Sequence, residues 1–288
     1  MTEQNTRKGI MLMILTTLIF AVQDAFSLHL SETYNVLMVV MMRYWFFAAF
    51  VIAMGIKQAG SLRAAASTAQ PGIQIFRSAL LALEICVMVL GFTYLGIIET
   101  QAVFICYPLL IAALSGPVLG EKVGWRRWSA IGVGFIGVLI ILEPGFGVFK
   151  PAAVIPLIAA LMFAGYGLLN RYVARKDSSA TSFFWTGVTG FVLMTAIGLS
   201  SWETMSGTDW ILMLILCIAG ASGHYLLIRV YEIAEASAVQ PFAYFQLAFG
   251  TMIAIPVFGE HIRTNVAIGA ALIIGAGLFT FFRERQKA

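Results

Sequence analysis

Hydrophobic residues run along most of the chain in ten long stretches, and short polar connections separate them. Each stretch is continuous rather than alternating, and most approach the roughly 20 residues that a helix needs to cross a bilayer. The predicted spans are 9–30, 35–56, 73–95, 100–119, 127–143, 153–174, 179–200, 209–231, 236–258 and 265–282. This pattern predicts an all-α membrane protein with ten transmembrane helices.

The composition narrows the class of protein further. Of the 288 residues, 60% are hydrophobic and 11% are charged, whereas a soluble domain carries about 25% charged residues. No soluble core of this length could bury so much apolar surface, which excludes a cytosolic enzyme, a disordered chain and a secreted disulfide scaffold. Cys86, Cys106 and Cys217 lie inside apolar spans without a CxxC spacing, so we expect no metal site and no cofactor.

Lysine and arginine are divided unevenly between the two sets of span ends. With the N-terminus in the cytoplasm, fifteen lie at cytoplasmic ends, whereas Lys150 and Arg263 lie at the other side and Arg43 lies within a span. Because short cytoplasmic loops collect basic residues, this bias predicts that both termini are cytoplasmic. The net charge is +4. Because the basic residues lie at span ends, they form no patch that would bind nucleic acid.

The two halves of the chain share short patterns. Pro-Val-Leu-Gly-Glu at 117–121 ends the fourth span, and Pro-Val-Phe-Gly-Glu at 256–260 ends the ninth. Leu-x-Phe-Ala occurs at 18–21 in the first span and at 161–164 in the sixth. We expect the glutamates that end the longer motif, Glu121 and Glu260, to cap or tether neighbouring helices.

Five spans in each half is an odd number, so the halves, 1–145 and 146–288, must insert in opposite directions. Such inverted repeats enclose a central site with two exits in many secondary transporters. On the two motif pairs and the single intramembrane Arg43, the chain resembles the drug/metabolite transporter superfamily, the EamA-type ten-helix transporters. Within that superfamily it is most similar to YddG-type amino-acid exporters. The resemblance implies export of small metabolites through a central cavity by alternating access.

Three charged residues lie inside the spans. Insertion of a charged side chain into the bilayer costs roughly 2.5–3.5 kcal/mol, so a structural or functional role is expected for each of them. Glu84 lies near the midplane of the third span, where it could bind a substrate ammonium or carry a proton. The alternative is a protonated acid that hydrogen-bonds a neighbouring helix. Asp24 and Arg43 lie at similar depth, which predicts a structural ion pair; carboxylate recognition by Arg43 is the alternative.

Further candidates lie at mid-span positions or beside prolines. Together with Glu84, the predicted substrate-binding residues are Met88, Tyr107, Tyr166, His224, Tyr244 and Gln246. Ordinary packing between helices is the alternative for each of them. Pro108 and Pro241 are predicted hinges, because proline frees a backbone carbonyl and loosens a helix beside a cavity.

Glycines gather in the fifth and tenth spans, at 132–137 and at Gly269, Gly275 and Gly277. The first group matches GxGxxG, but it lies inside an apolar helix with no preceding strand, so it predicts no nucleotide site. Faces of small residues let helices approach closely. These faces either join the two halves or pair with a second copy in a homodimer.

The sequence therefore predicts a secondary transporter of the cell inner membrane, which exports small amphipathic metabolites around a midplane cavity. Amino acids, including aromatic ones, are the preferred substrates in this interpretation. The expected partners are a small-molecule substrate and membrane lipid. The alternatives are an intramembrane enzyme that acts on lipid-linked substrates, and a channel or structural membrane subunit.

Overall fold

The computed structural model describes residues 6–120, 124–142, 151–234 and 239–285, and this part of the chain is helical without a strand. The long helices of the N-terminal half are α1 (Thr6–Thr33), α2 (Val36–Ala59), α4 (Pro71–Phe104), α5 (Tyr107–Leu119) and α6 (Trp125–Leu142). Those of the C-terminal half are α7 (Val154–Val173), α8 (Ser179–Gly198), α9 (Gly207–Ile233), α11 (Phe245–Phe258) and α12 (Thr264–Arg285). Short helical turns are α3 (Leu62–Ala65), η1 (Pro151–Ala153), η2 (Leu199–Ser201) and η3 (Gln240–Tyr244).

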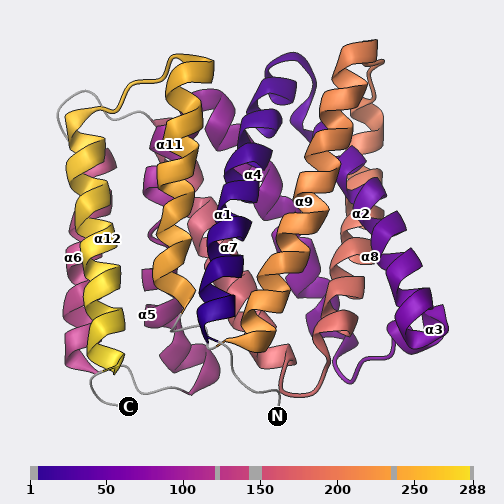
Figure 1. Ribbon diagram of the computed structural model, residues 1–288, viewed down its shortest axis with the longest axis horizontal. Helices are drawn as coiled ribbons and strands as arrows, with labels where there is room; N and C mark the ends of the chain where they lie inside the picture. The colour runs from indigo at the N-terminus through magenta and orange to yellow at the C-terminus, as the bar shows by residue number, and fades with distance from the viewer. Residues whose placement is uncertain (1–5, 121–123, 143–150, 235–238, 286–288) are drawn as a thin grey trace.

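The helices form an apolar bundle of the length that a membrane requires. Six of the described helices, α1, α2, α4, α7, α8 and α9, are long and apolar enough to cross a bilayer, and four shorter apolar helices accompany them. The first helix begins and the last helix ends at the same end of the bundle (Figure 1). The chain is therefore a multi-pass membrane protein; ten crossings and cytoplasmic termini remain predictions.

The repeated Pro-Val-x-Gly-Glu motif has a clear structural cause. Gly120 and Gly259 follow α5 and α11 in the left-handed conformation, with φ of 76° and 66°. Glycine adopts this conformation without steric cost and commonly ends a helix in this way. Pro117 and Pro256 lie in the last turns of the same two helices. The motif therefore ends each of these helices at an equivalent point.

Two helix interruptions follow one another here, the first between the predicted spans 73–95 and 100–119 and the second inside the later of these spans. Gly96, with φ of 79°, breaks the helical conformation inside α4, and a second break at residues 105–106 separates α4 from α5. The predicted span 100–119 is therefore two helical pieces. When Gly120 is aligned with Gly259, this second break lies opposite the junction of η3 and α11. Pro108 lies in the first turn of α5, and Pro241 lies in η3, so each predicted hinge adjoins an interruption.

Helix packing follows a regular scheme across the two halves. Helix α1 packs against α9 and α11, whereas α7 packs against α4 and α5. Helix α2 packs against α8, and α6 packs against α12 at one edge of the bundle (Figure 1). In each half, the first long helix (α1 or α7) therefore packs against the third and fourth long helices of the other half. The second long helices, α2 and α8, pack against each other, and so do the fifth, α6 and α12.

The glycine-rich faces of α6 and α12 meet each other within one chain. A Cβ at Gly137 would lie 2.7 Å from the carbonyl oxygen of Gly269, and a Cβ at Gly269 would lie 2.5 Å from that of Gly137. Backbone cannot yield as a side chain can, so these two positions require glycine. By contrast, no atom lies within 4 Å of a Cβ built at Gly132 or Gly275. The glycines therefore join the two halves, and a homodimer remains a prediction.

Candidate functional site

A central pocket lies between α1, α2, α4, α5, α7, α9, η3 and α11, and it encloses about 720 Å³ of non-protein space, its open mouth included. Both halves of the chain contribute to its wall. The charged and amide groups on the wall are Gln23, Asp24, Arg43, Glu84 and Gln246. An apolar bundle with such a lining can hold a solute that has both polar and apolar parts.

The structure brings most of the predicted residues together in this pocket. The predicted residues on its wall are Glu84, Met88, Tyr107, His224 and Gln246, together with Asp24 and Arg43. Tyr166 and Tyr244 are not among the residues that line it. Tyr244 instead directs its hydroxyl at α12, where a Cβ added to Gly277 would collide with it. The depth of a residue in a helix does not fix the side it faces, and a substrate-binding role for Tyr244 stays a prediction.

Asp24 is held by amide groups rather than by Arg43. Its Oδ2 accepts hydrogen bonds from Nε2 of Gln101 at 2.8 Å and from Nε2 of Gln246 at 3.0 Å. Its Oδ1 accepts a longer one from Nε2 of Gln23 at 3.4 Å. The predicted contact between Asp24 and Arg43 is not among the ion pairs of the described residues. A buried carboxylate takes the nearest donors, and here these come from α1 itself, from the end of α4 and from the start of α11.

Arg43 and Glu84 have few partners of their own. Arg43 is 7% exposed, and its Nη1 donates one long hydrogen bond of 3.5 Å to Ser27 Oγ. Glu84 is 4% exposed, and no hydrogen bond or ion pair joins it to another residue in the part of the chain that the structure describes. The sequence also allowed a protonated Glu84 that donates a hydrogen bond to a neighbouring helix. No such hydrogen bond is found among those residues. Both side chains border the pocket.

Aromatic side chains form much of the remaining wall. Phe104, Tyr107 and Phe163 contact one another with ring centroids 4.9–5.4 Å apart. His224 packs edge-on against Phe20, with centroids 5.2 Å apart. The sequence did not single out Phe104, Phe163 or Gln101. Of these only Gln101 carries a signal that could have found it, because a lone amide inside an apolar span requires a partner.

Tyr166 belongs to a second buried cluster, centred on Arg77. The Arg77 guanidinium lies 5.3 Å from the centroid of the Tyr166 ring, and the side chain of Arg77 is fully buried. Its nitrogens donate to Gln74 Oε1 at 2.8 Å, Asn170 Oδ1 at 2.8 Å, the carbonyl of Ser182 at 2.6 Å and Thr186 Oγ1 at 3.1 Å. This cluster joins α4, α7 and α8. Tyr166 therefore packs on a structural arginine, and its predicted role in the substrate site stays a prediction.

Asp177 extends the Arg77 cluster to the connection between α7 and α8. Its carboxylate accepts hydrogen bonds from Thr68, from the Ala69 N–H at 2.9 Å and from Gln74 Nε2 at 2.9 Å. Burial raises the pKa of Asp177, but these hydrogen bonds and the nearby Arg77 outweigh it, so the pKa lies below its ordinary value. The cluster thus holds the connection before α4 against the α7–α8 turn.

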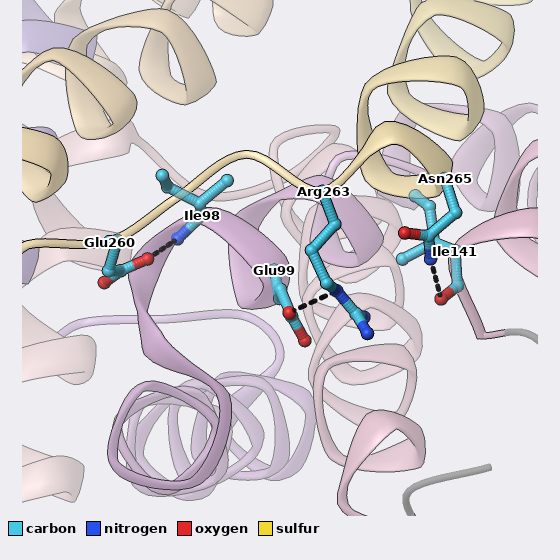
Figure 2. A network of polar contacts seen from close by, with 6 residues as sticks. All are labelled: Ile98, Glu99, Ile141, Glu260, Arg263 and Asn265. Atoms are coloured by element: carbon cyan, nitrogen blue, oxygen red, sulfur yellow. Dashed lines mark hydrogen bonds and ion pairs between the residues drawn. The ribbon is translucent and has the colours of Figure 1, made fainter. Parts of the chain in front are cut away.

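A separate network joins the α11–α12 connection to the interruption in α4 (Figure 2). The two carboxylate oxygens of Glu260 accept hydrogen bonds from the N–H groups of Ile97 at 2.7 Å and Ile98 at 2.9 Å. Gly96 has a φ of 79°, which favours glycine, and a Cβ there would also lie 2.8 Å from this carboxylate. The prediction that Glu260 caps a neighbouring helix is confirmed. Glu121 lies outside the described residues.

Two more contacts complete the network of Figure 2. Arg263 forms an ion pair with Glu99, with 2.7 Å between Nε and Oε1. Asn265 Nδ2 donates to the carbonyl of Ile141 at the end of α6, at 3.2 Å. The α11–α12 connection is therefore tied to α4, and the first turn of α12 is tied to α6; both partners belong to the other half of the chain.

The family model described as the EamA-like transporter family matches residues 7–143 and 150–282. The S-adenosylmethionine uptake transporter of Rickettsia prowazekii is 25% identical, over 97% of this chain and 94% of that protein. The riboflavin transporter of Vibrio cholerae is 28% identical, over 98% of this chain and 95% of that protein. The riboflavin transporter of Rhizobium johnstonii is 30% identical, over 78% of this chain and 74% of that protein.

A solved crystal structure has the same fold, with a TM-score of 0.69 at 15% identity, over 98% of this chain and 99% of that chain. The predicted location in the cell inner membrane agrees with the bacterial relatives. Because the family model matches two long stretches that together cover most of the sequence, the chain belongs to the EamA-like transporter family.

Proposed function

We propose that the chain is a secondary transporter that moves small amphipathic metabolites across the inner membrane by alternating access. The observation that carries this proposal is the central pocket, in which charged and amide groups from both halves of the chain lie inside an apolar bundle. Polar groups at this depth are costly and mark a solute pathway in membrane proteins. The named transporters among the relatives support the same class of function.

The proposed architecture is ten crossings in two inverted repeats, 1–145 and 146–288, with cytoplasmic termini. Three observations support it. The family model matches twice, once in each half. The helix contacts of the two halves correspond, α1 with α9 and α11 as α7 with α4 and α5. The left-handed glycines that end α5 and α11 occupy equivalent positions.

In the proposed mechanism the two halves move against each other around the pocket. The breaks beside Pro108 and Pro241 supply points where α5 and α11 can bend, because their backbone is not fully bonded there. The Arg77 cluster holds α4 against α7 and α8, and the Glu260 network holds the α11–α12 connection against α4. Alternating access requires that one exit opens while the other closes.

The proposed substrates are amphipathic metabolites, with amino acids, including aromatic ones, as the preferred class. S-adenosylmethionine and riboflavin, named for the relatives, are also small molecules with a planar ring system and polar groups. Export is the direction proposed from the sequence, although relatives are named for uptake. A carrier without its own energy source moves solute along the prevailing gradient, so the two directions require the same site.

Counterflow in proteoliposomes tests this function. Vesicles are loaded with unlabelled phenylalanine, S-adenosylmethionine or riboflavin, and entry of the labelled solute is followed with and without a pH gradient. We expect saturable counterflow of at least one solute, reduced in Glu84→Gln and Tyr107→Ala. Flux that does not saturate would favour a channel, and the absence of flux for every solute would contradict a transporter. Chemical conversion of an added lipid-linked substrate would favour an enzyme.

A further inference from the structure

Two opposite charges in the pocket form no direct ion pair with each other or with another residue that the structure describes. Arg43 is 7% exposed and has one hydrogen bond of 3.5 Å, to a serine hydroxyl. Glu84 is 4% exposed and has neither a hydrogen bond nor an ion pair with any residue that the structure describes. Both line the same pocket, Arg43 from α2 and Glu84 from α4.

The third charge in the pocket does not neutralise Arg43 by contact. The carboxylate of Asp24 is occupied by the amides of Gln101 and Gln246, which approach within 2.8 Å and 3.0 Å of the same oxygen. These glutamines come from the end of α4 and the start of α11, so Asp24 joins the two interrupted regions. Asp24 also lines the pocket, but its carboxylate is held by these amides, whereas Arg43 and Glu84 lack such partners.

A buried guanidinium cannot shed its proton, and an unpaired charge in an apolar surrounding is strongly unfavourable. A solute that brings a carboxylate removes this penalty at Arg43, which can donate two parallel hydrogen bonds to it. A solute ammonium does the same at Glu84. A cation and a carboxylate that border one space without a direct ion pair together match a zwitterion.

The remaining wall suits the rest of such a solute. Phe104, Tyr107 and Phe163 form a contiguous aromatic surface, and Met88 and Phe92 lie on the α4 side. Aromatic faces bind planar rings by stacking and bind cations through their π electrons. An amino-acid group between Arg43 and Glu84 would leave its side chain free to pack against these rings.

We propose that Arg43 binds the carboxylate and Glu84 the ammonium of an α-amino acid, so that the pocket selects zwitterionic solutes with an apolar or planar side group. This inference rests on the proposed transport function and refines its substrate class. It assigns to Arg43 a binding role, in place of the structural pair with Asp24. It also separates the solutes named for the relatives: S-adenosylmethionine carries an amino-acid group, whereas riboflavin is neutral and would satisfy neither charge.

The test measures competition rather than transport rate alone. Full-length protein in liposomes exchanges labelled phenylalanine or labelled S-adenosylmethionine. The competitors are phenylalanine, phenethylamine, which lacks the carboxylate, and 3-phenylpropionate, which lacks the ammonium. We expect wild type to prefer phenylalanine over each analogue by at least about tenfold, as for other desolvated charge pairs. The ratio of inhibition constants does not depend on how much protein is folded.

The variants should affect different ratios. Glu84→Gln should abolish the preference over 3-phenylpropionate and keep the preference over phenethylamine. Arg43→Gln should do the reverse, and Arg43→Lys should keep part of the preference over phenethylamine because it retains the charge. Glu99→Gln and Arg263→Gln are matched controls, since these groups pair with each other and do not line the pocket; both ratios should stay at wild-type values.

The possible failures are distinguishable. Exchange of a zwitterion with unchanged ratios in the Glu84 and Arg43 variants would overturn the inference and leave the transport function intact. Saturable exchange of riboflavin without exchange of either zwitterion would do the same. If no solute exchanges, the proposed function falls and the inference falls with it.

Discussion

Two buried arginines in the first half of the chain have opposite surroundings. Arg77 is fully buried and donates to Gln74, Asn170, Ser182 and Thr186 at 2.6–3.1 Å. Arg43 is almost as deeply buried, but its one hydrogen bond is 3.5 Å long, and it faces a pocket. Burial alone therefore does not reveal what an arginine does. The number of acceptors around it separates a charge that holds the fold from one that can receive a ligand.

The largest expected effect comes from removing the Arg77 charge. Arg77→Gln leaves several acceptors in the α4–α7–α8 cluster without donors, and we expect it to lower the free energy of unfolding by about 3–5 kcal/mol. Arg43→Gln removes a charge that has one weak partner, so its stability without solute should match or exceed that of wild type. Thermal unfolding of the purified proteins in one detergent gives the comparison. Equal losses in the two variants would contradict it.

A smaller effect is expected when one acceptor is removed from each arginine. Asn170→Ala deprives Arg77 of a 2.8 Å hydrogen bond and should cost about 1–3 kcal/mol, because a buried charged donor is left unsatisfied. Ser27→Ala removes the 3.5 Å contact of Arg43 and should change stability little. The measurement is again thermal unfolding without added solute. A loss in Ser27→Ala as large as that in Asn170→Ala would mean that Arg43 is structural.

The smallest effect concerns pH at the edge of the Arg77 cluster. Hydrogen bonds and Arg77 outweigh the burial of Asp177 and hold its pKa below the ordinary value of 3.8. The stabilisation is therefore complete at neutral pH and is lost as the pH falls through the lowered folded pKa. Asp177→Asn should lower stability at pH 7 and should lessen the decline below about pH 4. An identical pH profile for wild type and variant would exclude this contribution.

The sequence predicted the helices well, because each apolar run is long enough to define one. The predicted span 35–56 corresponds to α2 (Val36–Ala59), and 179–200 to α8 (Ser179–Gly198). The interruption at Gly96 falls between the predicted spans 73–95 and 100–119, whereas the break at residues 105–106, inside the second of these spans, was missed. Glycine is required at position 96 by its φ of 79°, and the carboxylate of Glu260, which comes from a distant part of the chain, lies against it.

The sequence predicted only some of the residues that line the pocket. Of the residues chosen from the sequence, Glu84, Met88 and Gln246 line the pocket, whereas Tyr166 and Tyr244 are not among its lining residues. Helices that are apolar all round do not reveal which side faces a cavity. Partners are also remote: Asp24 meets Gln101 and Gln246, and Arg77, assigned from the sequence to a cytoplasmic end, meets residues of α7 and α8.

Alternating access is tested most directly by labelling single cysteines in the pocket wall. Met13→Cys and Phe92→Cys place a thiol near the start of α1 and near the Gly96 interruption, in a background without the native cysteines. A membrane-impermeant thiol reagent is applied to oriented vesicles from either side. Alternating access predicts that added phenylalanine or S-adenosylmethionine raises the labelling rate at one of the two positions and lowers it at the other. Labelling of both positions from one side at rates that no solute alters would contradict it.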